Sequence, residues 1–151
     1  MNTYTSHSLE ETAKIAHDFL KEVSEKYVDT NEAIIVGLSG HLGAGKTAFV
    51  QMIAKELGVG EAVTSPSFVI MKIYELGTNS TISWKWKRLI HIDAYRLERP
   101  EELDVLDFEK LASDLHNLIL VEWPENVELE KLGESMHISF ESVNETHVIK
   151  F

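Results

Sequence analysis

The stretch that decides the fold reads Gly40-His41-Leu42-Gly43-Ala44-Gly45-Lys46-Thr47, and it fits the phosphate-loop pattern G-x-x-x-x-G-K-[ST] at every fixed position. Residues 33–36 before it are apolar and rich in β-branched side chains, which predicts a buried parallel strand. Residues 48–57 after it have helical spacing, and Gly58 is a suitable helix stop. A strand, a glycine loop and a helix in this order are what phosphate binding requires.

Each part of this loop has a physical task in holding phosphate. The glycines allow backbone turns that a Cβ would block, so that the chain can approach an anion closely. The exposed N–H groups and the start of the helix offer partial positive charge. Lys46 adds a full charge, and Thr47 adds a hydroxyl suited to Mg²⁺. We therefore expect a nucleotide with Mg²⁺ here, contacted by His41, Leu42, Gly43, Ala44, Gly45, Lys46, Thr47 and Ala48.

Length and composition place limits on the class of protein. The 151 residues suit one domain with a sizeable core. The formal net charge of −11 argues against unaided binding to nucleic acid, which normally needs a basic surface. The chain has no cysteine, which excludes disulfides, thiolate metal sites and cysteine nucleophiles. Since neither a signal-like N-terminus nor a long apolar run is present, we expect a cytoplasmic protein without membrane contact.

The rest of the chain predicts helices and strands around this centre. Ser8 and Glu11 form a capping-box pattern at the start of an amphipathic helix that runs to about residue 25. Residues 68–92 predict an antiparallel hairpin, with Trp84 and Trp86 packed on a sheet face. Further expected elements are a helix that starts near Pro100, a short helix at 108–113, a strand at 118–122, and a hairpin of strands 136–140 and 146–151 joined by a turn at 142–145. The predicted fold class is α/β: a P-loop NTPase-like mixed sheet, with a parallel core and antiparallel hairpins, flanked by helices in a single domain of residues 1–151.

Two carboxylates follow apolar strands elsewhere in the chain. Asp93 comes directly after residues 89–92, and Glu122 after residues 118–121. Ligands of α/β sheets bind beyond the carboxyl ends of the strands, so both acids face the loop if their strands run parallel to the first. Thr47, Glu122 and Asp93 then form a coherent Mg²⁺ environment, and one of the two acids could instead orient the attacking water. His91 alternates with Asp93, so it either hydrogen-bonds that acid or is an ordinary core histidine.

Together these residues resemble a known family. Four blocks occur in the order found in the TsaE (YjeE-like) P-loop ATPases of bacterial tRNA threonylcarbamoyladenosine biosynthesis. They are the phosphate loop, Ser65-Pro66-Ser67-Phe68, His91-Ile92-Asp93-Ala94-Tyr95-Arg96-Leu97 and Glu122-Trp123-Pro124-Glu125. Many nucleotidases share the loop, whereas the last two blocks are far more specific. His41 stands where the family usually has Asp, and Ser67 where it has Thr.

The resemblance implies a small ATPase that binds ATP and Mg²⁺ and works with a TsaD–TsaB complex on the adenosine beside the tRNA anticodon. Contact with tRNA would be indirect, through that complex. The resemblance also implies that Lys46 and Thr47 hold phosphates and Mg²⁺, and that Asp93 and Glu122 serve the metal and catalysis. It further places Trp123 close to the nucleotide and makes Thr64 to Ser67 a switch region.

Two other functions fit the loop as well. A small-molecule kinase shares the motif and the size, but it usually carries a basic lid over the phosphates, and no arginine-rich segment is present in this sequence. A non-catalytic module that changes its binding state with the nucleotide is the third alternative. We also find no obvious arginine finger near the loop, so we expect slow hydrolysis by the chain alone and stimulation by its partners.

Overall fold

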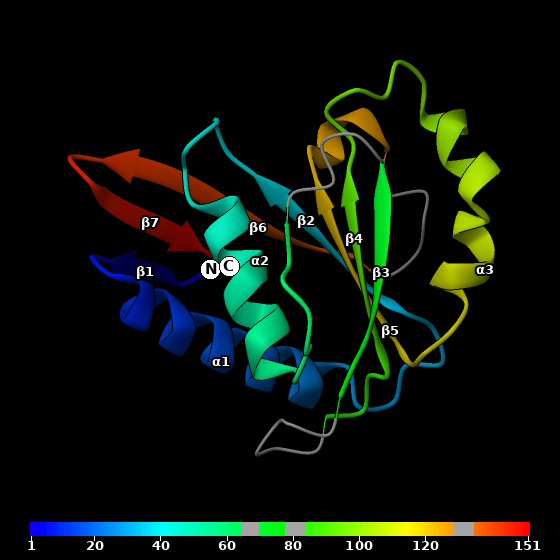
Figure 1. The fold of residues 1–151 in the computed structure, drawn as a ribbon, viewed down its shortest axis with the longest axis horizontal. Helices are drawn as coiled ribbons and strands as arrows, with labels where there is room; N and C mark the ends of the chain where they lie inside the picture. Colours follow the sequence, from blue (N-terminus) through cyan, green and yellow to red (C-terminus); the bar gives the residue numbers. More distant parts are fainter. Residues whose placement is uncertain (65–69, 78–83, 129–134) are drawn as a thin grey trace.

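The computed structural model describes residues 1–64, 70–77, 84–128 and 135–151. Its centre is a seven-stranded mixed sheet with the strand order β1-β7-β6-β2-β5-β4-β3 (Figure 1). The strands are β1 (Thr3–Ser6), β2 (Ile34–Ser39), β3 (Met71–Glu75), β4 (Arg88–Asp93), β5 (Asn117–Glu122), β6 (Ser135–Val143) and β7 (Thr146–Lys150). The helices are α1 (Leu9–Lys26), α2 (Lys46–Glu56) and α3 (Phe108–Ala112), with 3₁₀ turns η1 (Pro100–Leu106) and η2 (Pro124–Asn126).

The core of the sheet is parallel, as predicted. Strand β2 pairs with β5 on one side and with β6 on the other, and β5 pairs in turn with β4. Strands β2, β4 and β5 are almost entirely buried, which agrees with their continuous apolar sequences, because helices cover both faces of such a sheet. The parallel pairing of β6 with β2 was not predicted, since the sequence marks β6 only as half of a hairpin.

Helices lie on both faces of this sheet and divide the core in two (Figure 1). On one face, α1 and α2 pack over a cluster that includes Phe19, Phe49 and Leu120. On the other face, η1 and α3 cover a smaller cluster that includes Ile90, Val121 and Phe108. Residues that alternate along β4 and β5 therefore face different helices. Leu89, His91 and Asp93 share the α2 face with Glu122, because Asp93 and Glu122 are direct register partners.

The start of α1 differs in one contact from the predicted capping box. The hydroxyl of Ser8 accepts the Glu11 backbone N–H at 3.2 Å, as expected. The Glu11 carboxylate, however, accepts the backbone N–H of His7 at 2.7 Å instead of that of Ser8. This hydrogen bond lowers the pKa of the Glu11 carboxyl below its ordinary value. The reason is β1, an unpredicted strand, which ends at Ser6 and leaves the His7 N–H turned toward the helix.

Strands β3 and β4 form the predicted antiparallel hairpin, but β4 begins only at Arg88. Trp84 and Trp86 therefore precede the strand, so the predicted strand starts too early, but both rings do pack in the cluster on one face of the sheet. Trp86 is 3% exposed and buried in the core beneath α1, and Trp84 stacks on it with ring centroids 5.9 Å apart. Trp84 also meets the ring of His17 on α1, so contacts with this helix override the alternating pattern.

The helix expected near Pro100 is the 3₁₀ helix η1, which ends at Leu106. The next residue, Asp107, adopts a left-handed backbone conformation before α3 begins. The final hairpin is longer than predicted, because β6 continues to Val143. Only Asn144 and Glu145 turn the chain, with φ values of 49° and 65°. Positive φ at both central residues is the geometry of a tight two-residue hairpin turn.

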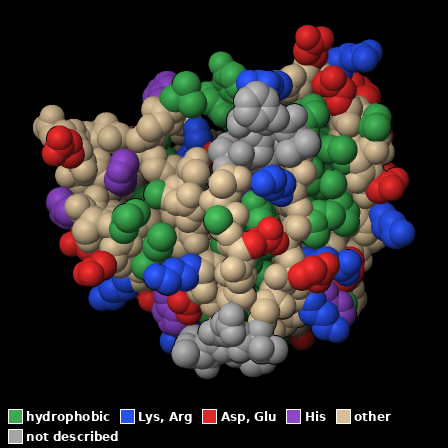
Figure 2. Space-filling model, viewed as in Figure 1, with side chains coloured by type: hydrophobic (Ala, Val, Ile, Leu, Met, Phe, Trp, Pro, Cys, Tyr) green, Lys and Arg blue, Asp and Glu red, His purple; other side chains and the backbone are tan. Residues whose placement is uncertain are grey.

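The surface carries mixed charge on the face that α2 covers. Lys and Arg side chains stand among Asp and Glu there, and they do not gather into a basic patch (Figure 2). This distribution agrees with the acidic net charge of −11. No helix in the part of the chain that the structure describes is long and apolar enough to cross a membrane.

Phe19 offers a test of the larger core cluster. Its side chain is fully buried, and its ring meets those of Phe49 and Phe151 at 5.8 and 5.0 Å. We expect Phe19→Ala to lower the free energy of unfolding by about 3–5 kcal/mol, because a cavity is left between α1, α2 and the last strand. Lys21→Ala, which changes an exposed residue on the same helix, should alter the free energy of unfolding by less than about 0.5 kcal/mol. Urea unfolding of both variants checks this, and equal losses would contradict the packing described.

Candidate functional site

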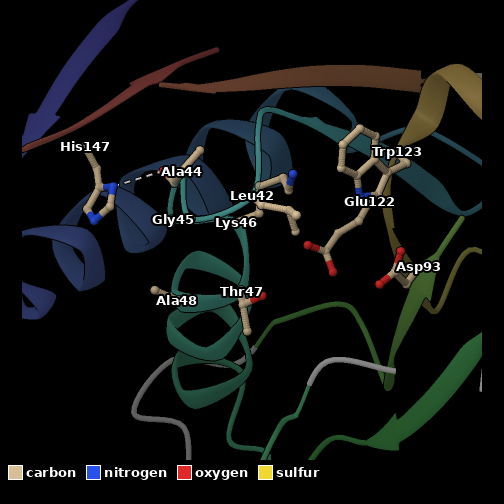
Figure 3. Close-up of a pocket in the computed structure, with 11 residues that line it drawn as sticks. Leu42, Ala44, Gly45, Lys46, Thr47, Ala48, Asp93, Glu122, Trp123 and His147 are labelled. Carbon is tan, nitrogen blue, oxygen red and sulfur yellow. Dashed lines mark hydrogen bonds between the residues drawn. The ribbon is translucent and has the colours of Figure 1, made fainter. Parts of the chain in front are cut away.

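A cavity of about 300 Å³ lies at the carboxyl ends of β2, β4 and β5 (Figure 3). This is where a doubly covered α/β sheet binds ligands. Its lining comes from the loop after β2, the first turn of α2, two strand ends and one residue of β7. The lining residues are Leu42, Gly43, Ala44, Gly45, Lys46, Thr47, Ala48, Asp93, Glu122, Trp123 and His147.

The glycine loop takes the conformation that its sequence predicts. Gly43 and Gly45 have φ values of 78° and 104°, which side chains with a Cβ rarely adopt. Gly45 is the residue before α2, so the first N–H groups of this 11-residue helix open onto the cavity. A helix start of this kind, flanked by a glycine loop, is suited to bind an anion such as phosphate.

The final hairpin supports the loop from behind. A Cβ at Gly40 would lie 2.6 Å from the carbonyl oxygen of Phe140 on β6, so only glycine fits there. His147 of β7 has its Nδ1 3.0 Å from the carbonyl oxygen of Ala44. His147 was not predicted as a site residue, because no local sequence pattern connects it with a loop about a hundred residues earlier.

Lys46 is the first residue of α2, and only 6% of it is exposed. Its ammonium donates to the carbonyl oxygen of Gly40 and lies 3.4 Å from that of His41. It also sits over the ring of Trp123, with Nζ 4.5 Å from the ring centroid. A phosphate oxygen is a stronger acceptor for an ammonium than a carbonyl is, so this side chain is well placed to serve a phosphate in the cavity.

Asp93 and Glu122 come together as the parallel strands predict. They are register partners on β4 and β5, and both carboxylates face the start of α2, where Thr47 lies (Figure 3). Oδ1 of Asp93 accepts the backbone N–H of Tyr95 at 3.0 Å. Oε2 of Glu122 lies 2.8 Å from Nε2 of His91. Of the two alternatives for His91, the structure favours the core histidine: the ring is fully buried and reaches Glu122 on the neighbouring strand instead of Asp93.

Trp123 stands at the rim of the cavity. Its backbone has a φ of 59°, which ends β5 abruptly and turns the ring toward Lys46. The exposed ring of Tyr95 lies against it, with ring centroids 5.0 Å apart. The two rings give the mouth of the cavity an aromatic edge that can lie against a bound nucleotide.

The donors around the cavity fit magnesium bound together with a nucleotide. In the described ranges, no group of three or more His, Asp and Glu side chains could hold a metal ion alone. Mg²⁺ is usually held by one or two carboxylates, a hydroxyl and the oxygens of the substrate phosphates. Thr47, Asp93 and Glu122 are oxygen donors of this kind around the cavity that the phosphate loop lines.

Most of the residues predicted from the sequence line this cavity. Those from Leu42 to Ala48, together with Asp93, Glu122 and Trp123, do so. His41 is exposed at the start of the loop and does not line the cavity. Its carbonyl oxygen accepts from the backbone N–H of Ala44 at 3.1 Å and from Lys46 at 3.4 Å. Of the predicted switch segment, Thr64 to Ser67, the residues from Ser65 to Ser67 lie outside the described residues.

A second hollow of about 130 Å³ adjoins the loop on the side of the last hairpin. It shares Gly45, Ala48 and His147 with the first cavity and is completed by residues at the start of α1 and by Glu145 and Ile149. The loop thus borders two spaces, so a ligand with a part beyond its phosphates has room beside them.

Comparison with known proteins decides the family. Residues 6–149 match the family model described as threonylcarbamoyl adenosine biosynthesis protein TsaE. The chain belongs to the TsaE family. The match covers every element from the end of β1 to β7, so it includes the loop, both carboxylates and the supporting hairpin.

Individual TsaE proteins agree with this match. The chain is 42% identical over 102 residues to a tRNA threonylcarbamoyladenosine biosynthesis protein TsaE of Streptomyces coelicolor, covering 66% of this chain and 62% of that protein. It is 37% identical over 123 residues to a protein of the same name from Rickettsia conorii, covering 81% and 61%. The chain thus spans about three fifths of the length of these curated relatives.

A solved structure confirms the fold. The crystal structure of Bacillus subtilis YdiB matches with a TM-score of 0.63 at 25% sequence identity, covering 98% of this chain and 82% of that one. The mixed sheet with a parallel core and flanking helices is therefore shared with a protein of known structure.

Lys46 provides the first test of the site. We expect Lys46→Ala to raise the Kd for ATP by roughly 10-fold to 100-fold, because each hydrogen bond to a charged group is worth about 1.5–3 kcal/mol. Lys55→Ala, an exposed lysine later on the same helix, should leave the Kd nearly unchanged. Titration calorimetry on both folded variants measures the effect. Unchanged affinity in Lys46→Ala would show that the loop does not hold the phosphates.

Proposed function

We propose that this chain binds ATP with Mg²⁺ and hydrolyses it in support of tRNA threonylcarbamoyladenosine formation. The observation that carries the proposal is one cavity that combines a complete phosphate loop with two carboxylates from adjacent parallel strand ends. Membership of the TsaE family supports the pathway. ATP, and not another nucleoside triphosphate, is proposed from the family resemblance.

In this proposal, the glycine loop and the start of α2 bind the phosphates, and Lys46 neutralises charge on the outer ones. Thr47 and one or both of Asp93 and Glu122 would hold Mg²⁺, which when bound neutralises charge that develops on the phosphate oxygens. A carboxylate that is not engaged by the metal would orient the attacking water. Trp123 would cover the bound nucleotide at the rim and exclude bulk water.

The proposal extends to partners and to location. A complex like TsaD–TsaB would carry the tRNA, so this acidic chain would not touch the nucleic acid directly. Of the described residues that line the cavity, Lys46 is the one lysine or arginine. A partner that supplies a further cation to the phosphates would therefore raise the rate substantially. The proposed location is the cytoplasm.

The carboxylates should matter for turnover and little for folding. We expect Asp93→Asn and Glu122→Gln to lower kcat for ATP hydrolysis on the order of 10²–10³-fold, the usual cost of losing one group that stabilises developing charge. Asp104→Asn and Glu109→Gln, which change exposed acids on η1 and α3, are the matched controls and should keep full activity. Steady-state kinetics, with partners present, compares the four, and thermal melting confirms that each is folded. Full activity in either site variant would remove that residue from the catalytic set.

Partner dependence is tested by adding a TsaD–TsaB complex to the purified chain. We expect slow hydrolysis alone and stimulation that approaches 10³-fold, the lower end of what a cation supplied in trans contributes. Because the chain carries a net charge of −11, docking on a basic surface should weaken as salt rises. Measurements at low and moderate salt check both statements. Vigorous turnover by the isolated chain, indifferent to the complex, would instead favour a self-sufficient nucleotidase or kinase.

A further inference from the structure

His91 is a buried polar residue to which the proposed function assigns no task. It lies near the end of β4 and has no exposed surface. Along the parallel ladder its partner is Leu120, yet its ring reaches two residues further along β5. There Nε2 lies 2.8 Å from Oε2 of Glu122, whose side chain is only 5% exposed. The contact therefore joins two strands inside the sheet and directly beneath the cavity.

The chemistry of the two groups sets the direction of this hydrogen bond. An ionised carboxylate can only accept, so Nε2 carries the hydrogen and donates it to Oε2. Nδ1 is buried without a hydrogen-bond partner among the described residues. The neutral ring with its proton on Nε2 places a bare lone pair at that position, whereas a second N–H would be buried and unsatisfied. This tautomer makes the ring a donor to Glu122, and among the described residues Nδ1 meets no further hydrogen-bonding group.

Each of the two acids of the site has one carboxylate oxygen held by a hydrogen bond from the protein. Asp93 has one oxygen held by the backbone N–H of Tyr95, and Glu122 has one oxygen held by His91. Both residues also line the cavity. Each acid is thus left with one oxygen that is not bound in these contacts. The hydrogen bond restricts Glu122 more than Asp93, because the longer glutamate side chain has more rotamers to lose.

We propose that His91 is a positioning residue for Glu122, holding Oε2 so that Oε1 faces the phosphate loop and Thr47. This inference rests on the proposed function, in which Glu122 serves Mg²⁺ and hydrolysis. Groups that orient metal ligands in this way typically contribute 10-fold to 100-fold to activity or metal affinity. The competing explanation is simple packing, in which His91 only fills space on the face of the sheet that α2 covers.

Two amide substitutions separate these explanations. The amide nitrogen of Gln reaches about as far as Nε2 of histidine, while that of Asn reaches only as far as Nδ1. We expect His91→Asn to lower kcat by roughly 10-fold to 100-fold, to weaken the Mg²⁺-dependent part of ATP binding, and to leave binding in EDTA unchanged. His91→Gln should retain activity within a few-fold. His137→Asn, an exposed histidine on β6, is the control and should match the parent chain.

A double-mutant cycle and a spectroscopic measurement make the test sharper. If His91 acts through Glu122, then His91→Asn should add almost no further loss to Glu122→Gln. Nitrogen-15 NMR of the histidine rings should show His91 protonated on Nε2 in the parent chain. Equal losses in the Asn and Gln variants, losses that follow the melting temperature, additive losses in the cycle, or a ring protonated on Nδ1 would each overturn the positioning role.

Results that contradict the proposed function differ from results that contradict only the role of His91. In that case the parent chain would show neither Mg²⁺-dependent ATP binding nor partner-stimulated hydrolysis, or Glu122→Gln would keep full activity. Either result removes the task for which His91 would position Glu122, and the inference fails with it. If Glu122→Gln loses activity and His91→Asn does not, only the inference about His91 is overturned.

Discussion

The hydrogen-bonded register of β2, β5 and β4 is the constraint on which the rest of the structure depends. It aligns Leu38 with Glu122 and Glu122 with Asp93, so the strand that leads into the glycine loop and both acids end in one row. A slip of one residue in either pairing would turn the acids to the opposite face, toward α3. Continuous burial of these strands keeps the register fixed, because a shifted strand would lose its match to the two hydrophobic clusters. The chemistry of the cavity is therefore a result of ordinary sheet packing.

Around this row, the site is held by contacts that restrict its groups in advance. The ammonium of Lys46 is fixed between loop carbonyls and the ring of Trp123. One oxygen of each acid is engaged by the protein. Groups that are already oriented lose less entropy when a ligand arrives, and they remain aligned as charge moves during a reaction. The arrangement is therefore compatible with the hydrolysis that we propose.

The parts of this site that could be predicted are those with a local sequence pattern. The glycine loop has fixed spacing, and Asp93 and Glu122 directly follow apolar strands, so their position at one edge followed from the rules of α/β sheets. Contacts between distant segments could not be predicted. The contact between His91 and Glu122 depends on the register of β4 and β5, which the sequence does not show. His147 reaches the loop from a strand about a hundred residues away. Strand β1 is four residues long and barely apolar, and the alternation around Trp84 and Trp86 imitates a strand while contacts with α1 decide the structure.

The wall that β6 and β7 form behind the loop has a consequence for how the motif is understood. Gly40 fits only because it lies against the backbone at Phe140, and the carbonyl of Ala44 is held by His147. The conformation of the phosphate loop therefore depends on its surroundings. Residues 34–56 moved into another sheet would bring the motif without the hairpin contacts that support it. An anion that binds the loop stabilises the folded state as a whole, and this includes the hairpin that supports the loop and the pairing of β7 with β1. Strand β7, near one end of the sequence, thus supports the loop directly, and β1, near the other end, supports β7.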